Sequence, residues 1–279
     1  MAMIGLMAVV LPVYLSVLGG TDFEARNAAM DSLVSSGDID GVALAVYESG
    51  WFVREGLFIV LERIGEDAVP ALIDIATHHA KVDAQRLAIR GLGRVGGKMA
   101  RDVLVTMVHG PHRDLAVEGL GQVGDSSLVV VIKPLLKDKW PDVRRRAALA
   151  LIALEGVAAL DVVIPMLSDG HHGVRFAVAE ALMGVGEPVA EVLAKHYVSL
   201  SWAGRFLALR LIGQLGRPVS VLMVALQEED WALRAAAVDN IGLLGKSNFI
   251  KVLEKMRNRE RHPVVRLRID QAIKRLSQG

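Results

Sequence analysis

The sequence predicts an all-α fold, an α-solenoid wound as a right-handed superhelix from about nine stacked two-helix repeats. Three observations predict it. An arginine, replaced once by glutamine, recurs every 28 to 32 residues along the chain. Leu or Ile follows each of these anchor residues by seven positions, and glycine follows most of them by eleven. A fixed period of this length indicates one helical hairpin per copy.

The anchors occupy one position of the repeat, and they are Arg26, Arg54, Gln85, Arg113, Arg144, Arg175, Arg205, Arg234 and Arg266. Residues three, four and seven positions after each anchor are nearly all apolar, which is the spacing of a buried helix face. Glycine can adopt the left-handed conformation that ends a helix. The glycines at the eleventh position are Gly37, Gly65, Gly96, Gly124, Gly186, Gly216 and Gly245. We therefore expect each copy to begin with a helix that a glycine ends.

A second apolar run follows each glycine, for example residues 68–79 and 126–139. These runs predict the second helix of each hairpin. Pro188 and Pro218 fall in the first turn of theirs, where a missing N–H costs little. Pro134 and Pro165 lie further in, and we expect them to bend their helices. A hairpin of about 30 residues cannot bury its apolar face alone, so we expect residues 1–279 to form a single repeat domain.

The motif Val-Arg-x-x-Ala-Ala-x-Ala-Leu, followed by glycine and by a second helix containing Val-Pro-Ala-Leu, carries a family resemblance. It appears as residues 143–151 and 69–72. This pattern resembles the HEAT-like repeat of the phycobilisome-lyase type, over nearly the whole chain. The resemblance implies an armadillo-like helical scaffold. Its members serve protein binding, bilin attachment and, in some branches, DNA or metal chemistry, so it implies no single function.

Composition limits the classes of function. The chain has 32 Lys and Arg against 31 Asp and Glu, a net charge of +1, which argues against a general polyanion binder. Without cysteine it has neither disulfides nor thiolate chemistry. The eight histidines include no His-Glu-x-x-His or repeated His-Glu motif. We predict no catalytic residues, no metal site and no cofactor, and we expect a cytoplasmic protein with a protein partner rather than nucleic acid.

The first 20 residues carry no charged side chain and are long enough to cross a bilayer. They lack the basic residues that usually precede a signal sequence. Pro12 stands 14 residues before Arg26, much as Pro70 stands 15 before Gln85. This register favours a capping helix for residues 1–20. A membrane segment is the alternative, and the same apolar surface would also suit a homodimer.

Arginines and tryptophans recur in step with the repeat. An arginine ladder would suit phosphates or carboxylates, but the repeat favours a structural role in which each arginine bonds the adjoining turn. Trp51, Trp140, Trp202 and Trp231 all precede an anchor by three or four residues. Such tryptophans either stack on bases or pack against the start of a helix. We favour packing.

The carboxyl-terminal residues 246–279 hold ten Lys or Arg against three Asp or Glu, while the rest of the chain is mildly acidic. This segment is expected to be a polar cap, alone or with a bound acidic partner. The candidate partner-binding residues are Arg145, Arg146, Trp202, Trp231, Lys251, Lys255, Arg257, Arg259 and Arg261.

We expect the function to be a non-enzymatic scaffold or adaptor that holds a protein on the concave face, lined by the second helices. The alternatives are a subunit resembling a bilin lyase and a DNA-binding protein resembling HEAT-like glycosylases. Mixed charges along the second helices, such as Glu191 with Lys195, disfavour the DNA-binding alternative.

Overall fold

The computed structural model describes residues 2–215 and 219–278, and the side chains within them except those of residues 2–9 and 219. These residues form α-helices, 3₁₀ helices and connecting turns, with no strand among them. The predicted all-α solenoid is confirmed. Backbone contacts divide the chain into two compact units, Met1–Leu135 and Leu136–Gly279. The predictions for Gly216 and Pro218 lie outside the described residues.

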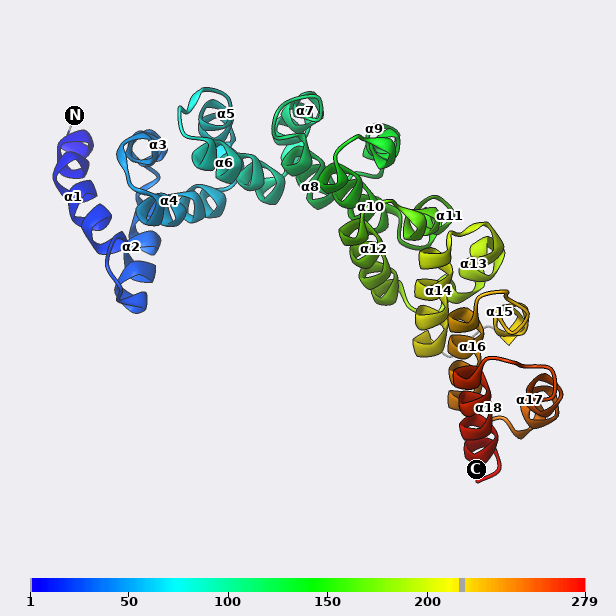
Figure 1. Cartoon of the computed structure of the whole chain (residues 1–279). Coiled ribbons are helices and arrows are strands. Elements are labelled where there is room, and N and C mark those ends of the chain that lie inside the picture. Colours follow the sequence, from blue (N-terminus) through cyan, green and yellow to red (C-terminus); the bar gives the residue numbers. More distant parts are fainter. Residues whose placement is uncertain (1, 216–218, 279) are drawn as a thin grey trace. The chain divides into compact units, whose positions relative to one another are not determined.

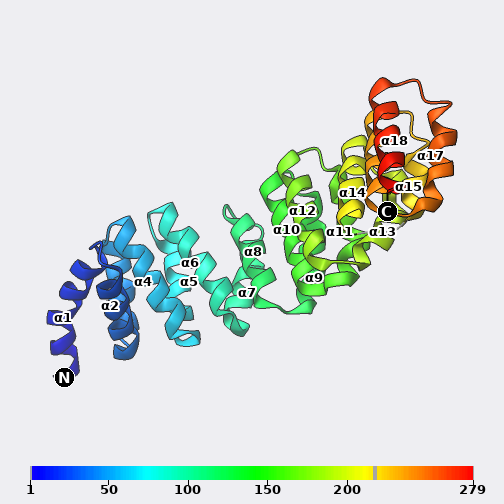
Figure 2. The ribbon, with the colours of Figure 1, turned by 90° about the horizontal axis from the view of Figure 1, so that it is seen from below.

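In the first unit, each anchor residue begins or lies near the start of a long helix that is followed by a shorter one. The long helices are α2 (Phe23–Ser36), α4 (Trp51–Ile64), α6 (Val82–Val95) and α8 (Arg113–Val123). The shorter helices are α3 (Ile39–Glu48), α5 (Val69–His78), α7 (Gly97–Met107) and α9 (Val129–Ile132). The 3₁₀ helices η1 (Glu66–Ala68) and η2 (Ser126–Leu128) lead into α5 and α9. Figures 1 and 2 show consecutive hairpins stacked along the unit.

The second unit repeats the same pattern. Its first helices are α10 (Pro141–Glu155), α12 (His172–Val185), α14 (Trp202–Leu215), α16 (Trp231–Leu243) and α18 (Pro263–Leu276). Its second helices are α11 (Leu160–Val163), α13 (Pro188–His196), α15 (Val219–Ala225) and α17 (Ile250–Arg257). Its 3₁₀ helices are η4 (Gly156–Ala159), η5 (Ile164–Ser168), η6 (Tyr197–Ser199) and η7 (Ser247–Phe249), and η3 (Lys133–Lys137) spans the unit boundary.

The two rows of helices in the first unit lie on opposite sides of its curve. Figure 1 shows α3, α5, α7 and α9 along the outer side and α4, α6 and α8 along the inner side. The expectation that second helices line the concave face is therefore wrong for this unit. The sequence pattern shows which face of each helix is buried, but it does not show which way the stack bends.

The predicted glycines all have positive φ where they are described, but they do so in two conformations. Gly37 and Gly124 are left-handed, with ψ of 13°. Gly65, Gly96 and Gly186 have φ of 71° to 88° and ψ of −141° to −147°, a region that only glycine enters freely. Each glycine therefore ends its helix as predicted, although the direction in which the chain leaves differs.

The internal prolines change the type of helix rather than only bending it. α9 ends at Ile132, and the 3₁₀ helix η3 contains Pro134. Likewise α11 ends at Val163, just before the 3₁₀ helix that contains Pro165. A proline ring clashes with the preceding helical turn and offers no N–H, so the α-helical bonding pattern stops there. Pro188 is the first residue of α13, as predicted.

The amino-terminal helix α1 (Ala2–Leu18) contains Pro12 and packs against α2 and α4, with Leu18 fully buried. This is how the second helix of a preceding hairpin would pack. Its role as a cap, and the alternatives of a membrane segment or a homodimer surface, stay predictions.

One stretch of the described residues, Pro141–Ser168, is long and apolar enough by length and composition to cross a membrane. Its residues form α10, η4, α11 and η5, and 44% of its most apolar window is buried inside the protein. Ala147, Ala148 and Leu151 belong to the core of the second unit.

Glycines allow α6 and α8 to approach closely. A Cβ added to Gly93 would lie 2.5 Å from the Cα of Gly119, closer than two carbon atoms can pack. Gly93 is also buried. The glycines of residues 91–97 therefore serve packing and helix ends, as the repeat register predicts.

We predict that Gly93→Ala destabilises the protein by about 1–3 kcal/mol, because the added methyl forces two helix backbones apart. The matched control is Gly184→Ala, in a helical position where nothing lies within 4 Å of the added Cβ. That substitution should stabilise by about 0.5–1 kcal/mol, since alanine favours a helix over glycine. Urea unfolding of both variants is the measurement. Equal effects of the two substitutions would contradict the close approach.

Candidate functional site

Four of the eight arginine anchors join consecutive repeats through a carboxylate of the next turn. Arg144 forms a two-pronged pair with Asp169, with distances of 2.7 and 2.8 Å. A single nitrogen of Arg205, Nη1, donates to the two oxygens of Glu228 at 3.1 and 2.9 Å. Arg234 binds those of Glu260 at 2.7 and 2.9 Å. The bidentate pairs of Arg144 and Arg234 fix both distance and orientation. We call these two pairs, together with Arg205–Glu228 and Arg54–Asp83, the rungs of the arginine ladder.

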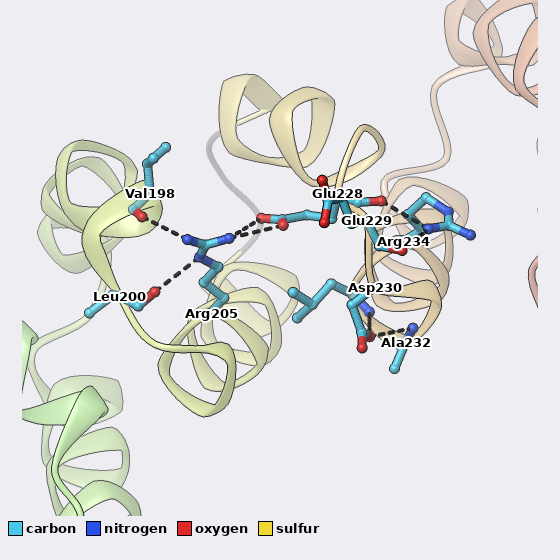
Figure 3. Close-up of polar contacts among 9 residues, drawn as sticks. Val198, Leu200, Arg205, Glu228, Glu229, Asp230, Ala232 and Arg234 are labelled. Carbon is cyan, nitrogen blue, oxygen red and sulfur yellow. Dashed lines mark hydrogen bonds and ion pairs between the residues drawn. The ribbon is translucent and has the colours of Figure 1, made fainter.

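Each of these arginines also donates to carbonyls of the turn that precedes its own helix. Figure 3 shows Arg205 donating to the carbonyls of Val198 and Leu200, at 2.8 and 3.0 Å, while it binds Glu228. Arg234 donates in the same way to the carbonyls of Glu228 and Glu229. One guanidinium therefore ties its own turn to the next. This confirms the structural interpretation for Arg54, Arg144, Arg205 and Arg234.

Burial and hydrogen bonding set the charge state of the rung carboxylates. Burial alone would raise the pKa of Asp169, but hydrogen bonds from Arg144 and the His171 N–H outweigh it, so the pKa is lowered. For Glu260, the hydrogen bond from Arg234 is the largest cause of a lowered pKa. Only 6% of the Asp169 side chain and 5% of the Glu260 side chain are exposed. These carboxylates are committed to the joints and are poorly placed to meet a ligand.

The joint formed by Gln85 has an uncharged anchor and no arginine–carboxylate pair at that position. Gln85 replaces arginine, and its Oε1 lies 3.0 Å from His112 Nε2. Burial is the largest cause that lowers the pKa of His112, followed by the charge of Arg86, while Asp114 acts in the opposite direction. A charged imidazole is therefore disfavoured in this joint.

Two of the four tryptophans, Trp202 and Trp231, contact the neighbouring turn, as the packing interpretation predicts. Trp202 lies beside Asp230, whose carboxylate accepts hydrogen bonds from the backbone N–H groups of Ala232 and Leu233. Together with Trp202, these bonds outweigh burial and lower the pKa of Asp230. Trp231 stacks on His262 with ring centres 4.3 Å apart. Both rings still remain about half exposed, at 52% and 43%.

The nine predicted partner-binding residues lie in the second unit but do not form one site. Arg145 pairs with Asp142 at 3.0 Å on the exposed side of α10, and Arg146 is half-buried beside it. Trp202 and Trp231 lie at the joints. Arg257 is held by Asp270. The remaining four line a groove of about 750 Å³ that α15, α16, α17 and the turn after α17 form. They are Lys251, Lys255, Arg259 and Arg261. Whether these nine residues bind a partner stays a prediction.

The structure adds an apolar surface that was not predicted. The position directly after the anchor holds Phe176, Phe206 and Leu267 in three of the five copies of the second unit, and Arg145 and Ala235 in the other two. Polar residues such as Glu55 and Asp114 occupy it in the first unit. Phe176 and Leu267 are 54% and 56% exposed. We call Phe176, Phe206 and Leu267 the apolar row. Comparison of this single column between the two halves of the sequence would have revealed it.

Phe176 borders a groove of about 210 Å³ between α12 and α14. Met183, Leu207 and Leu211 form its apolar lining, with Glu180 and Arg210 at its edge. Beside it on α14, Trp202 stacks on Phe206 with ring centres 5.7 Å apart. Aromatic and apolar side chains are thus gathered on the exposed side of these two first helices.

A polar cluster on α3 and α5 was also not predicted from the sequence. Tyr47 donates to Asp74 at 2.6 Å, and His78 Nδ1 lies 2.9 Å from the other oxygen of Asp74. Burial and the Asp74 carboxylate raise the pKa of Tyr47 to about 12. The phenol therefore stays protonated near neutral pH and is poorly suited to act as a base. Within the described residues no group of three or more His, Asp or Glu is arranged to hold a metal ion.

The class of protein follows from the stacked hairpins and their arginine joints. The family model of HEAT repeats matches residues 69–152, 109–183 and 190–274, which together cover more than half of the chain. The chain belongs to the HEAT repeat family. A comparison with curated proteins gave no match.

Several solved structures are similar to this chain. YibA of Escherichia coli is 19% identical with a TM-score of 0.53, over 93% of this chain and 98% of YibA. Importin beta is 11% identical with a TM-score of 0.59, over 96% of this chain and 45% of importin beta. The CpcE–CpcF complex of phycocyanin lyase from a Nostoc species is 19% identical with a TM-score of 0.43, over 83% of this chain and 92% of the other. At these identities the likeness shows the fold alone, and the phycobilisome-lyase type of repeat stays a prediction.

We predict that Arg234→Gln destabilises the protein by about 3–5 kcal/mol, because it leaves the buried Glu260 carboxylate without its charge partner. Arg266→Gln is the matched control, since this anchor is exposed and forms no ion pair with any residue that the structure describes. The free energy of unfolding should change by less than about 0.5 kcal/mol for the control. Denaturant titration measures both. A similar small effect of the two substitutions would contradict a stabilising role of the Arg234–Glu260 pair.

We predict that His112 makes stability depend on pH. Its pKa in the folded protein lies below the ordinary value of 6.5, so the unfolded chain binds the proton more readily. Stability is therefore full above about pH 6.5 and falls as the pH drops below it. In His112→Gln, whose amide can still donate to Gln85, this loss should be smaller. Denaturant unfolding across this pH range compares the two proteins, and superimposable pH profiles would refute the prediction.

Proposed function

We propose that this protein is a binding scaffold for another protein, and that it binds through the exposed side of the first helices in its second unit. The apolar row is the observation that carries the proposal. Large apolar side chains occupy one repeat position in three of the five copies of this unit, where all four copies of the other unit have polar ones. Exposed apolar side chains gathered on one surface mark sites of protein association.

The surface around Phe176 has the composition of an interface centre. Aromatic residues and methionine are enriched at such centres, with polar residues around them. Here Phe176, Met183 and Leu207 surround the small groove, and Glu180 and Arg210 border it. A partner side chain that enters this groove would be enclosed by apolar atoms from two adjacent repeats.

The arginine ladder supports the same proposal in a different way. Its rungs join α10 to the turn before α12 and α14 to the turn before α16, on either side of the groove, so each helix that borders the groove is tied to its other neighbour before a partner arrives. A preorganised surface loses less conformational freedom on binding, which favours affinity. The ladder is therefore the support of the proposed surface and not part of it.

The test is quantitative capture of proteins from the cells that make this chain, with intact wild type, Phe176→Glu and Val157→Glu as baits. Val157 is 52% exposed, close to the 54% of Phe176, but it lies in η4 away from the apolar row. We expect proteins that the wild type and Val157→Glu retain and that Phe176→Glu loses, by about tenfold or more for a central interface residue. If the Phe176→Glu bait retained the same proteins in the same amounts, the proposed surface would be wrong.

A further inference from the structure

The groove at the carboxyl-terminal end of the second unit combines free cations with an apolar floor. Lys251, Lys255, Arg259 and Arg261 are all exposed around it. Met223 and Met256 contribute to its floor. With a volume of about 750 Å³ it is large enough for several side chains of a bound segment. We call it the basic groove.

The acids that line the basic groove are already neutralised. Glu228 is bound by Arg205, and Glu260 is bound by Arg234 and by the backbone N–H groups of Arg261 and His262. Their side chains are only 13% and 5% exposed. Neither carboxylate is therefore available to the cations on the rim.

The four rim cations have no side-chain hydrogen bond or ion pair with any residue in the described part of the chain. By contrast Arg257, on the same helix, is paired with Asp270. The positive charge of the rim is thus uncompensated. It attracts an anionic partner, and a positive patch that meets a negative one gives both faster association and specificity.

We propose that the basic groove binds an acidic, amphipathic segment of a protein partner, with carboxylates on the rim cations and an apolar side chain on the methionine floor. The proposal rests on the proposed scaffold function and specifies one segment that the scaffold would hold. Methionine side chains adapt to apolar partners of varied shape. Flexible lysines suit dispersed carboxylates.

The lining of the groove favours a peptide over other polyanions. None of its lining residues is aromatic, so bases of a nucleic acid would find no stacking platform there. An anionic headgroup would satisfy the rim cations and leave the apolar floor uncovered. A peptide that alternates carboxylates and apolar side chains at helical spacing satisfies both parts.

The probe is a fluorescein-labelled synthetic peptide with glutamate on one helical face and leucine on the other. Its control has glutamine at every glutamate position. Fluorescence anisotropy with the full chain should show binding of the glutamate peptide that weakens as salt increases. The glutamine peptide should bind at least about tenfold more weakly, because only its apolar face has a complementary surface in the groove.

The variants are the double substitution Lys251→Glu with Lys255→Glu and, as its control, Arg266→Glu with Lys274→Glu. Both change the net charge equally, and the control residues are exposed on α18 outside the groove. We expect about tenfold weaker binding for the groove variant and less than about threefold for the control. Met256→Ala should weaken binding while leaving the salt dependence unchanged, since it removes apolar contact only. Thermal melting of each variant checks that it folds.

Equal binding by the groove variant and its control, or no binding by the wild type, would overturn the proposal. It would also be overturned if a DNA duplex, or vesicles containing phosphatidylserine, bound more tightly than the peptide through Lys251 and Lys255. The peptide experiment is independent of the capture experiment, because Phe176→Glu lies outside the groove and should leave peptide affinity unchanged. A negative result of the capture experiment, which tests the apolar row, can therefore be distinguished from a negative result of the peptide experiment, which tests the basic groove.

Discussion

The arginine that bridges two successive turns is the interaction on which the rest of the structure depends. Each helical hairpin is too small to bury its apolar face, and stacking supplies the missing contacts. Apolar packing between helices is not directional, so it leaves the register between hairpins loosely defined. A guanidinium that binds two carbonyls of its own turn and the carboxylate of the next fixes that register. Arg205, with Val198, Leu200 and Glu228, shows the whole arrangement (Figure 3).

The ladder also explains why the most conspicuous charged residues of the sequence are not its best candidates for function. A carboxylate that accepts a bidentate arginine and is almost fully buried has little capacity left for a ligand. Function is therefore expected on the surfaces that the joints leave open. The apolar row and the basic groove are two such surfaces, one apolar and one cationic, and both belong to the second unit.

Much of this architecture could be predicted from the sequence because its signals recur. The anchor column, the buried stripe and the helix-ending glycines repeat often enough to separate them from chance, and they place the helices correctly. The bend direction could not be predicted, since it depends on small differences in packing between the two rows. Trp202 was identified as a candidate because it belongs to a recurring position. Phe176 was missed because its column carries a large apolar residue in only three of the nine copies, so it does not stand out in the repeat as a whole.

A double-mutant cycle on Arg144 and Asp169 tests most directly whether these rungs hold the repeats together. Asp169 lies in the turn that precedes α12, and its pair with Arg144 on α10 is mostly buried, with 18% and 6% of the side chains exposed. We predict a coupling energy of about 1–3 kcal/mol in the free energy of unfolding, within the range of pairs in direct contact. A coupling energy of about zero, like that of many exposed ion pairs, would contradict the central role of the ladder.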